Sequence, residues 1–494
     1  MPGDSIVETP SGRLRGRRTN TGSEFAGIPY GSAPRFAPPV ASGRWIGIRD
    51  ALAPGPAAPQ PERPVASFTH GELGATSEDC LYLNVFTPSR TGRRPVLVWL
   101  HGGGFTIGHA AASLYHGARL ADQADAVVVT VNYRLGSLGW LAHPELAPDD
   151  RAPTGNWGLL DQLAALGWVH EQIESFGGDA TQVTLAGQSA GALSAMDLLI
   201  APGGQPPFRR AILQSPPIGD VAQTAERASA WAQALSERAG AGPGFDTALL
   251  RSLPAERIVA LQEELLAQPA FRGTRGGALP TLDPASLPRS PRDDPGAAPR
   301  VDVLIGSTGE EGTFYFDSPW RPPPPDDAVA GIVGHLPGIN DAAEALERYG
   351  ARARRLGRAA GPRALLVQIA TDALIAEPVA RWASARASAL AGSPASVHRY
   401  RVDHRGAGDQ LGATHTVEVP LLFGTWADGG PGQRLGGQGT GAAAVARAML
   451  GAWRGFVHGD GPGWKALGAD GQASEVAVFG GEEPFTVESG RERR

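Results

Sequence analysis

Short apolar runs and helix-like segments follow one another along the chain before residue 190. Pro95–Leu100 (PVLVWL) and Ala126–Tyr133 (AVVVTVNY) are short and almost wholly apolar, and the second is rich in β-branched residues, so each predicts a buried strand. Residues 155–178 carry apolar positions at helical spacing and end in two glycines, which predicts a helix. Thr181–Gly187 (TQVTLAG) predicts the strand that follows.

Three further strands are predicted at 210–215, 300–307 and 396–402. Doubly apolar strands that alternate with helices are typical of an α/β fold with a large, mostly parallel central sheet flanked by helices. Two mainly helical stretches, roughly 216–299 and 328–391, interrupt the strand series. We interpret them as insertions that cap one end of the sheet.

Composition supports a globular protein, which we expect to form a single domain over residues 1–494. Hydrophobic residues make up 42% of the chain and charged residues 19%. The net charge of −6 gives no electrostatic case for nucleic acid or an anionic membrane, and no apolar stretch of about 20 residues predicts a membrane span. Asp428–Gly441 is rich in glycine and low in complexity, which predicts a mobile loop.

The segment LAGQSAG places Ser189 between two glycines. The Gly-x-Ser-x-Gly pattern is a weak signal by itself in a chain with 67 glycines. Here, however, the serine directly follows a predicted strand and precedes a helix of small residues, where the chain must turn sharply. Gly187 and Gly191 give the room that such a turn requires. Ser189 is therefore a candidate nucleophile at the carboxyl end of the sheet, where such folds bind ligands.

The glycines of HGGGF, residues 101–105, follow the predicted strand 95–100 directly. Without Cβ atoms, backbone N–H groups can converge on a carbonyl oxygen, so the segment is a candidate oxyanion hole. A dinucleotide-binding loop is excluded by spacing, because Ile107 stands where the last glycine of that motif would be. A plain glycine-rich turn remains the alternative.

A nucleophilic serine needs a base, and the base needs an acid to orient it. Glu310 and Glu311 follow the predicted strand 300–307, and either could be the acid, although two solvated loop carboxylates are the simpler interpretation. The histidines after Glu311 are His335, His398, His404, His415 and His458. His415 lies in a loop just before an apolar run, a position that suits the base.

Nine blocks, in order and nearly end to end, resemble the type-B carboxylesterases, the α/β-hydrolase family that includes bacterial para-nitrobenzyl esterases and cholinesterases. The blocks are FAGIPYGSAPRFAPP, SEDCLYLNVFTP, PVLVWLHGGGF, VNYRLGSLGWL, the segment GNWGLLDQLAALGWVHEQIESFGGDATQVTLAGQSAGA, RAILQS, LIGSTGEEGTF, THTVEVPLLFG and AMLGAWRGFVHGDGPGW. The resemblance implies an α/β-hydrolase fold with helical insertions capping an active-site gorge. It also implies that no metal or cofactor is required.

Residue by residue, the resemblance implies Ser189 as nucleophile, His415 as base and Glu311 as acid. Glu311 is favoured over Glu310 because the family's acid immediately precedes the glycine of an E-G pair. The resemblance implies further site residues: the backbone N–H groups of Gly103, Gly104 and Ala190 as oxyanion donors, with Phe105 and Trp140 lining the substrate pocket.

The sequence departs from the family pattern at several places. Gln188 stands where glutamate is commoner, Thr416 follows the candidate base where the family often has glycine, and the GIPYGSAPRF block is short. Cys80, the only cysteine, keeps its place but lacks the disulfide partner of secreted relatives, and we interpret it as a buried structural residue. With no apolar run of signal-peptide length at the N-terminus, this predicts a cytoplasmic protein.

The favoured hypothesis is hydrolysis of small to medium, apolar or aromatic carboxylic esters through an acyl-enzyme. Two alternatives use the same fold. An acyltransferase or a dedicated natural-product hydrolase would share the triad, and a catalytically silent binding protein would typically lack one of its members. The expected partner is a small-molecule ester, and the sequence leaves open whether the protein is a monomer or a homodimer.

Overall fold

The structure, a computed structural model, forms two compact units that are described one at a time. The first unit lies within residues 1–211 and 221–301, and the second within 212–220 and 302–494. The described residues are 4–149, 151–200, 205–218, 223–268, 271, 277–406, 411–471 and 475–489. Parts of the predicted insertion 216–299 therefore lie outside the described residues. The expectation of a single domain stays a prediction.

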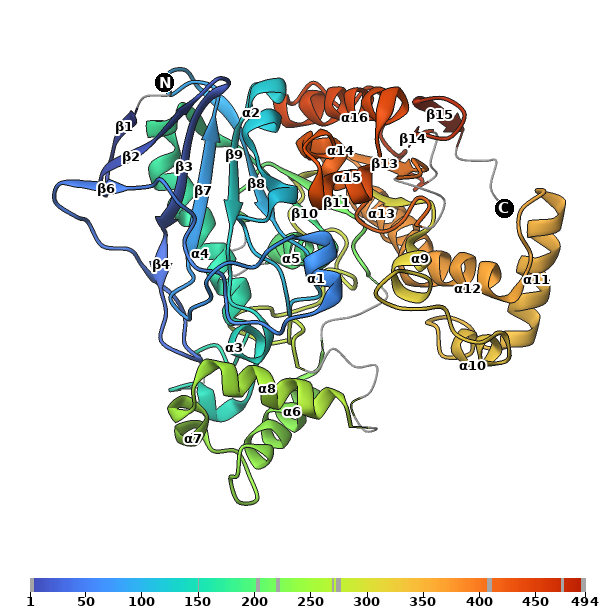
Figure 1. Ribbon diagram of the computed structural model, residues 1–494, viewed down its shortest axis with the longest axis horizontal. Coiled ribbons are helices and arrows are strands. Elements are labelled where there is room, and N and C mark those ends of the chain that lie inside the picture. Colours follow the sequence, from blue (N-terminus) through green and yellow to red (C-terminus); the bar gives the residue numbers. More distant parts are fainter. Residues whose placement is uncertain are drawn as a thin grey trace. The chain divides into compact units, whose positions relative to one another are not determined.

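The strands of the first unit form a mixed sheet in the order β1-β2-β3-β7-β9-β8-β10 (Figure 1). Their bounds are β1 (Asp4–Thr9), β2 (Gly12–Thr19), β3 (Gly22–Pro29), β7 (Tyr82–Thr87), β8 (Arg94–Leu100), β9 (Val127–Val131) and β10 (Gly178–Gln188). Short strands β4 (Gly31–Ser32) and β5 (Val40–Ala41) pair with each other, and β6 (Ile48–Asp50) pairs with β2. Strand β8 pairs in parallel with both β9 and β10. The three strands predicted before residue 190 are thus confirmed.

In the first unit the hydrophobic pattern missed the strands β1 to β7, which pair antiparallel except for β6, a parallel neighbour of β2. Every residue of β9 is buried, and all of them except Thr130 are valine, as expected for a strand buried on both faces. In β1, by contrast, buried and exposed positions alternate, and two of the three buried positions are Ser5 and Thr9. Because two of the buried residues are polar, β1 lacks the alternation of apolar and polar residues that predicts a strand.

Helices cover the sheet of the first unit and form a separate cluster beside it (Figure 1). Their bounds are α1 (Pro64–Thr69), α2 (Ala118–Ala124), α3 (Gly136–Trp140), α4 (Trp157–Gln172), α5 (Ala190–Asp197), α6 (Ala225–Arg238), α7 (Thr247–Ser252) and α8 (Ala255–Leu266). Helices α2, α4 and α5 pack on the strands. The helices of the predicted insertion, α6 to α8, pack with α3 and the start of α4 around Trp157, Trp231 and Leu261.

The strands of the second unit pair in the order β11-β12-β13-β14-β15. The bounds are β11 (Arg210–Gln214), β12 (Asp302–Thr308), β13 (Val397–Val402), β14 (Glu475–Phe479) and β15 (Phe485–Ser489), and β11 begins where the chain leaves the first unit. Strand β12 pairs in parallel with β13, and β13 with β14, whereas β15 runs antiparallel to β14. The strands predicted at 210–215, 300–307 and 396–402 are confirmed.

The helices of the second unit include the predicted stretch 328–391, which is helical as expected. The bounds are α9 (Glu311–Phe316), α10 (Val329–Val333), α11 (Ala342–Arg355), α12 (Pro362–Thr371), α13 (Glu377–Ala389), α14 (Glu418–Phe423), α15 (Gly430–Gly436) and α16 (Gly439–His458). Helices α10, α11 and α12 are neighbours in Figure 1 and share one apolar cluster. A π-helical turn, Asp372–Ala376, joins α12 to α13. No helix among the described residues is both long and apolar enough to span a membrane.

The prediction of a mobile loop at 428–441 is wrong, because the segment holds helix α15 and the start of α16. Its glycines allow close packing. A Cβ on Gly432 would lie 2.2 Å from the carbonyl oxygen of Thr425, and one on Gly436 would lie 2.9 Å from Cβ of Trp426. The glycines of this segment therefore allow neighbouring atoms to approach closely. Composition alone does not distinguish such close packing from a flexible linker.

Two buried side chains illustrate how polar groups are held in the first unit. Cys80 is fully buried, as predicted, and burial raises the pKa of its thiol. Arg134, which follows β9, forms a bidentate pair with Asp161 of α4 at 2.7 and 2.8 Å, and the backbone N–H of Arg134 donates to the same carboxylate. The pair therefore joins the end of a central strand to the helix that covers it.

Replacing Asp161 by asparagine should lower the free energy of unfolding by about 3–5 kcal/mol, because a buried guanidinium would lose its charged partner. Chemical denaturation measures the change. The matched control is Arg381→Gln, which breaks the exposed Glu377–Arg381 pair of helix α13 and should cost no more than about 0.5 kcal/mol. Equal losses in the two variants would contradict the structural role of the Arg134–Asp161 pair.

Candidate active site

Ser189 occupies a strained turn between strand β10 and helix α5. Its φ is +57° and its ψ is −121°, a backbone conformation that residues with a side chain rarely adopt. The turn ends the strand abruptly and starts the helix in one residue. The sharp strand-to-helix turn predicted from LAGQSAG is therefore present.

Close contact between backbones explains the two glycines that flank Ser189. A Cβ on Gly187 would lie 2.4 Å from the carbonyl carbon of Gly191, and a Cβ on Gly191 would lie 2.1 Å from the carbonyl oxygen of Leu100. Real Cβ atoms essentially never approach other atoms this closely. The glycines are thus required by the approach of α5 to β10 and β8.

The glycine loop after β8 lies against this turn. Gly103, Gly104 and Phe105 have φ values of +115°, +61° and +63°, so three successive residues take the left-handed conformation. A Cβ on Gly102 would meet the backbone oxygen of Gln188 at 2.9 Å and Cβ of Ser189 at 3.2 Å. The loop and the serine are therefore neighbours within the first unit, as an oxyanion hole requires.

His101 fixes the start of the glycine loop. Its ring stacks on Tyr133 with the ring centroids 4.3 Å apart, and the Tyr133 hydroxyl donates to the His101 carbonyl oxygen at 2.6 Å. Burial lowers the pKa of His101 to about 3, so the imidazole is neutral at physiological pH. Its role is thus to hold the loop in place.

Phe105 and Trp140 lie together, with ring centroids 4.6 Å apart, and both side chains are fully buried. Trp140 ends helix α3, and the N–H of Gly136, the first residue of that helix, donates to the Phe105 carbonyl oxygen at 2.8 Å. The two rings form a buried aromatic pair, and Phe105 directly follows the glycine loop. That they line a substrate pocket stays a prediction.

The second unit holds a buried histidine–carboxylate pair. Nδ1 of His415 lies 2.5 Å from Oε2 of Glu311, and both side chains are almost completely excluded from solvent. The backbone N–H of Thr308 donates to Oε1 of Glu311 at 2.7 Å, so the carboxylate is held from both sides. The rings of Phe314 and Tyr315 pack on the imidazole. Since Nδ1 faces Glu311, Nε2 is directed to the opposite side of the ring.

The neighbouring carboxylate, Glu310, is turned the other way. It pairs with Arg405 at 2.8 Å and accepts the N–H of Ala413 at 2.8 Å, and its side chain remains partly exposed. Sequence reasoning without the resemblance left Glu310 and Glu311 as alternatives. In the structure, Glu311 is the carboxylate that contacts His415.

Thr416 explains one departure from the family pattern. Its φ is +80°, in the left-handed region that favours glycine. The residue after His415 thus keeps the backbone conformation of a glycine although a threonine occupies the position. The local strain costs on the order of 1–3 kcal/mol and is tolerated because the surroundings are packed.

Glu418 is a site residue that the sequence analysis missed. It is fully buried at the start of α14, one turn beyond His415, and accepts a hydrogen bond from Gln214 at 3.3 Å. Burial and the charge of Glu311 raise its pKa to about 7. The available signal was a lone acid inside the apolar run VEVPLLFG.

The predicted site residues therefore fall into two groups, one in each unit. Ser189, Ala190 and the glycine loop belong to the first unit, and Glu311 and His415 to the second. The structure brings together the members of each group. Their assembly into one site is part of the function proposed below. Among the residues that the structure describes, no group of three or more His, Cys, Asp or Glu side chains could hold a metal ion.

A mixed sheet flanked by helices, with a serine at a sharp strand–helix turn, defines an α/β hydrolase. Solved structures of that fold agree closely with the chain. A thermophilic PNB esterase matches with a TM-score of 0.82 and 31% identity over 99% of this chain and 98% of its own. A carboxylesterase of Geobacillus stearothermophilus matches with a TM-score of 0.79 and 32% identity over 98% of this chain and 97% of its own.

The chain belongs to the carboxylesterase family, whose sequence model matches residues 3–467. The para-nitrobenzyl esterase of Bacillus subtilis is 33% identical over 431 residues, covering 85% of this chain and 83% of that protein. The phenmedipham hydrolase of Pseudarthrobacter oxydans is 34% identical over 429 residues, covering 85% and 82%. The protein is accordingly an ester-hydrolysing enzyme.

The raised pKa of Glu418 predicts a pH dependence of stability. Between about pH 4.5 and 7 the folded protein keeps a proton that the unfolded chain releases, so the free energy of unfolding falls as the pH rises. Glu418→Gln removes this titration. From pH 5 to pH 8, the wild type should lose about 2–3 kcal/mol more than the variant in urea unfolding. Parallel pH profiles would show that Glu418 does not titrate in this range.

Proposed function

We propose that Ser189, His415 and Glu311 act together as the catalytic triad of a serine carboxylesterase. The observation that carries the proposal is the buried contact between His415 Nδ1 and Glu311 Oε2. This contact fixes the tautomer that carries its proton on Nδ1 and leaves Nε2 as the base. The strained turn at Ser189 supplies the nucleophile that such a base requires.

Hydrolysis proceeds through an acyl-enzyme in this proposal. Nε2 of His415 takes the Ser189 proton as Oγ attacks the ester carbonyl, and the resulting imidazolium gives that proton to the departing alcohol. Water then attacks the acyl-enzyme, losing a proton to Nε2, and the carboxylic acid leaves as the proton returns to Ser189. Each step transfers one proton and needs no metal or cofactor.

Backbone N–H groups of Gly103, Gly104 and Ala190 stabilise the tetrahedral oxyanion. Two features support this assignment. The left-handed conformation of Gly103 and Gly104 aligns successive peptide units in the loop beside Ser189. Ala190 is the first residue of α5, so its N–H has no acceptor within the helix and adds the positive end of the helix dipole.

Glu311 acts on His415 rather than on the substrate. Its carboxylate holds the imidazole in one orientation and stabilises the imidazolium formed during attack. Burial strengthens this effect because little water screens the charges. The Thr308 N–H keeps the carboxylate oriented toward the ring.

We propose small to medium esters with apolar or aromatic groups as the substrates. The support is the aromatic pair of Phe105 and Trp140 next to the glycine loop. Similarity to a protein named as a para-nitrobenzyl esterase points the same way. Aromatic walls favour apolar substrate groups through burial and ring contacts.

Ser189→Ala should lower kcat for para-nitrophenyl esters by roughly 10⁴-fold or more, because the nucleophile is lost. The measurement is turnover of a series from acetate to decanoate, whose chain-length optimum also sizes the acyl pocket. Near-wild-type turnover by a folded Ser189→Ala variant would overturn the proposed nucleophile.

The two adjacent glutamates provide a matched pair of variants. Glu311→Gln should lower kcat by roughly 10²–10⁴-fold, because the buried imidazolium loses its counter-charge. Glu310→Gln should change kcat less than about threefold, since Glu310 contacts Arg405 instead. Steady-state kinetics at one pH tests both, and the reverse ranking would assign the acid to Glu310.

A further inference from the structure

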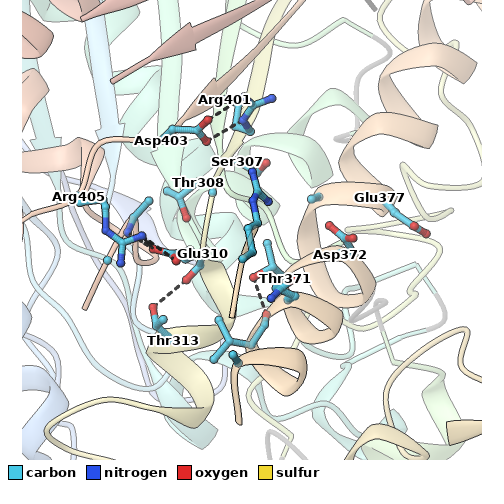
Figure 2. Close-up of a pocket in the computed structure, with 18 of the residues that line it drawn as sticks. Ser307, Thr308, Glu310, Thr313, Thr371, Asp372, Glu377, Arg401, Asp403 and Arg405 are labelled. Atoms are coloured by element: carbon cyan, nitrogen blue, oxygen red, sulfur yellow. Dashed lines mark hydrogen bonds and ion pairs between the residues drawn. The ribbon is translucent and has the colours of Figure 1, made fainter. Parts of the chain in front are cut away.

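A polar cleft of about 800 Å³ opens within the second unit. Its walls come from the end of β12, the turn before α9, helices α12 and α13, the π-helical turn between them, and β13 (Figure 2). Glu311 and His415 are not among its lining residues. A volume of this size suits a small organic molecule rather than a single ion.

Most charged side chains of the cleft already have partners. The pairs are Arg401 with Asp403 at 2.7 Å and with Glu488 at 3.2 Å, Arg405 with Glu310 at 2.8 Å, and Asp372 with Tyr349 at 2.8 Å and Arg352 at 3.6 Å. Figure 2 shows the Arg401–Asp403 and Glu310–Arg405 pairs on neighbouring walls. The carboxylates of Asp317 and Glu377 pair with Arg363 and Arg381. The acids of the cleft are therefore engaged.

The exposed Arg358 forms no ion pair among the described residues, and neither does the more buried Arg399. Arg399 lies two residues before Arg401 on β13, so both side chains stand on the same face of the strand, and Ser307 of β12 lies opposite Arg401 in the register. Nε of Arg399 is buried, and no hydrogen-bond partner for it exists among the described residues. Burial, and then the charge of Arg401, lower the pKa of Arg399. The guanidinium of Arg399 therefore lies near that of Arg401 and has no carboxylate paired with it among the described residues.

We infer that this cleft binds a small organic anion, whose carboxylate or phosphate group pairs with the guanidinium of Arg399. A planar guanidinium matches either oxyanion through two parallel hydrogen bonds, and an anion would neutralise the charge that Arg399 now carries next to Arg401. The hydroxyl of Ser307, on the same face of the sheet, adds a second donor. The remaining volume accommodates the organic part of the ligand.

The cleft shares a turn with the Glu311–His415 pair. Residues 307–310 line the cleft, while the N–H of Thr308 within the same turn holds Oε1 of Glu311. An anion bound at Arg399 would thus lie on the other side of the segment that positions Glu311. Binding itself requires no ester hydrolysis, so the site can be tested independently of the proposed function.

Isothermal titration calorimetry on the full chain, carrying Ser189→Ala so that turnover plays no part, tests the inference. The probes are inorganic phosphate, citrate and benzoate at constant ionic strength. At least one should bind with a Kd on the order of 0.1–1 mM, which suits a few charge-assisted hydrogen bonds. Tighter binding of phosphate than of the carboxylates would identify a phosphate-bearing ligand, and the reverse order a carboxylate.

Matched arginine variants locate the binding. Arg399→Met should weaken it at least tenfold, and Arg399→Lys, which keeps the charge but not the fork, should weaken it less. Arg355→Met, which removes an exposed arginine at the end of α11, should leave the Kd unchanged. Circular dichroism confirms that each variant is folded. Absence of binding by all three probes, or equal binding by wild type and a folded Arg399→Met variant, would overturn the inference.

Discussion

The approach of helix α5 to strands β8 and β10 is the constraint on which the first half of the site depends. The Leu100 carbonyl oxygen occupies the space that a Cβ on Gly191 would need, so the helix can only start there with a glycine at that position. The same close packing forces Ser189 into a positive φ and leaves room for the glycine loop beside it. One strained residue, costing about 1–3 kcal/mol, is the result. Neighbouring contacts hold it in place.

In the second unit, the cost of burying several charged groups together constrains the arrangement around Glu311 and His415. Glu311, His415 and Glu418 lie close together and are all excluded from solvent. Two ionised carboxylates at such a distance would repel each other, and burial makes that repulsion expensive. Burial, and then the charge of Glu311, raise the pKa of Glu418 to about 7. Of the two carboxylates, Glu311 is the one in contact with the imidazole.

The features predicted from the sequence are those that a local property of the chain determines, such as a run of apolar residues or a pair of glycines at a sharp turn. Continuous apolar runs became the buried parallel strands, and Gly187 and Gly191 marked the sharp turn at Ser189. The features that it missed depend on partners distant in sequence. Polar residues face inward on β1, the glycines of α15 pack against Thr425 and Trp426, and Glu418 matters only because Glu311 lies nearby. No local pattern encodes those contacts.

The turn between β12 and α9 serves two sets of neighbours at once. Consecutive residues Glu310 and Glu311 face opposite sides, one toward Arg405 and the cleft, the other toward His415. Free-energy linkage gives this arrangement a strict consequence. If an anion in the cleft alters how tightly the enzyme holds an ester, the ester must alter anion affinity by the same factor. Ligand affinities on the two sides of this turn are therefore thermodynamically reciprocal, whatever the sign of the coupling.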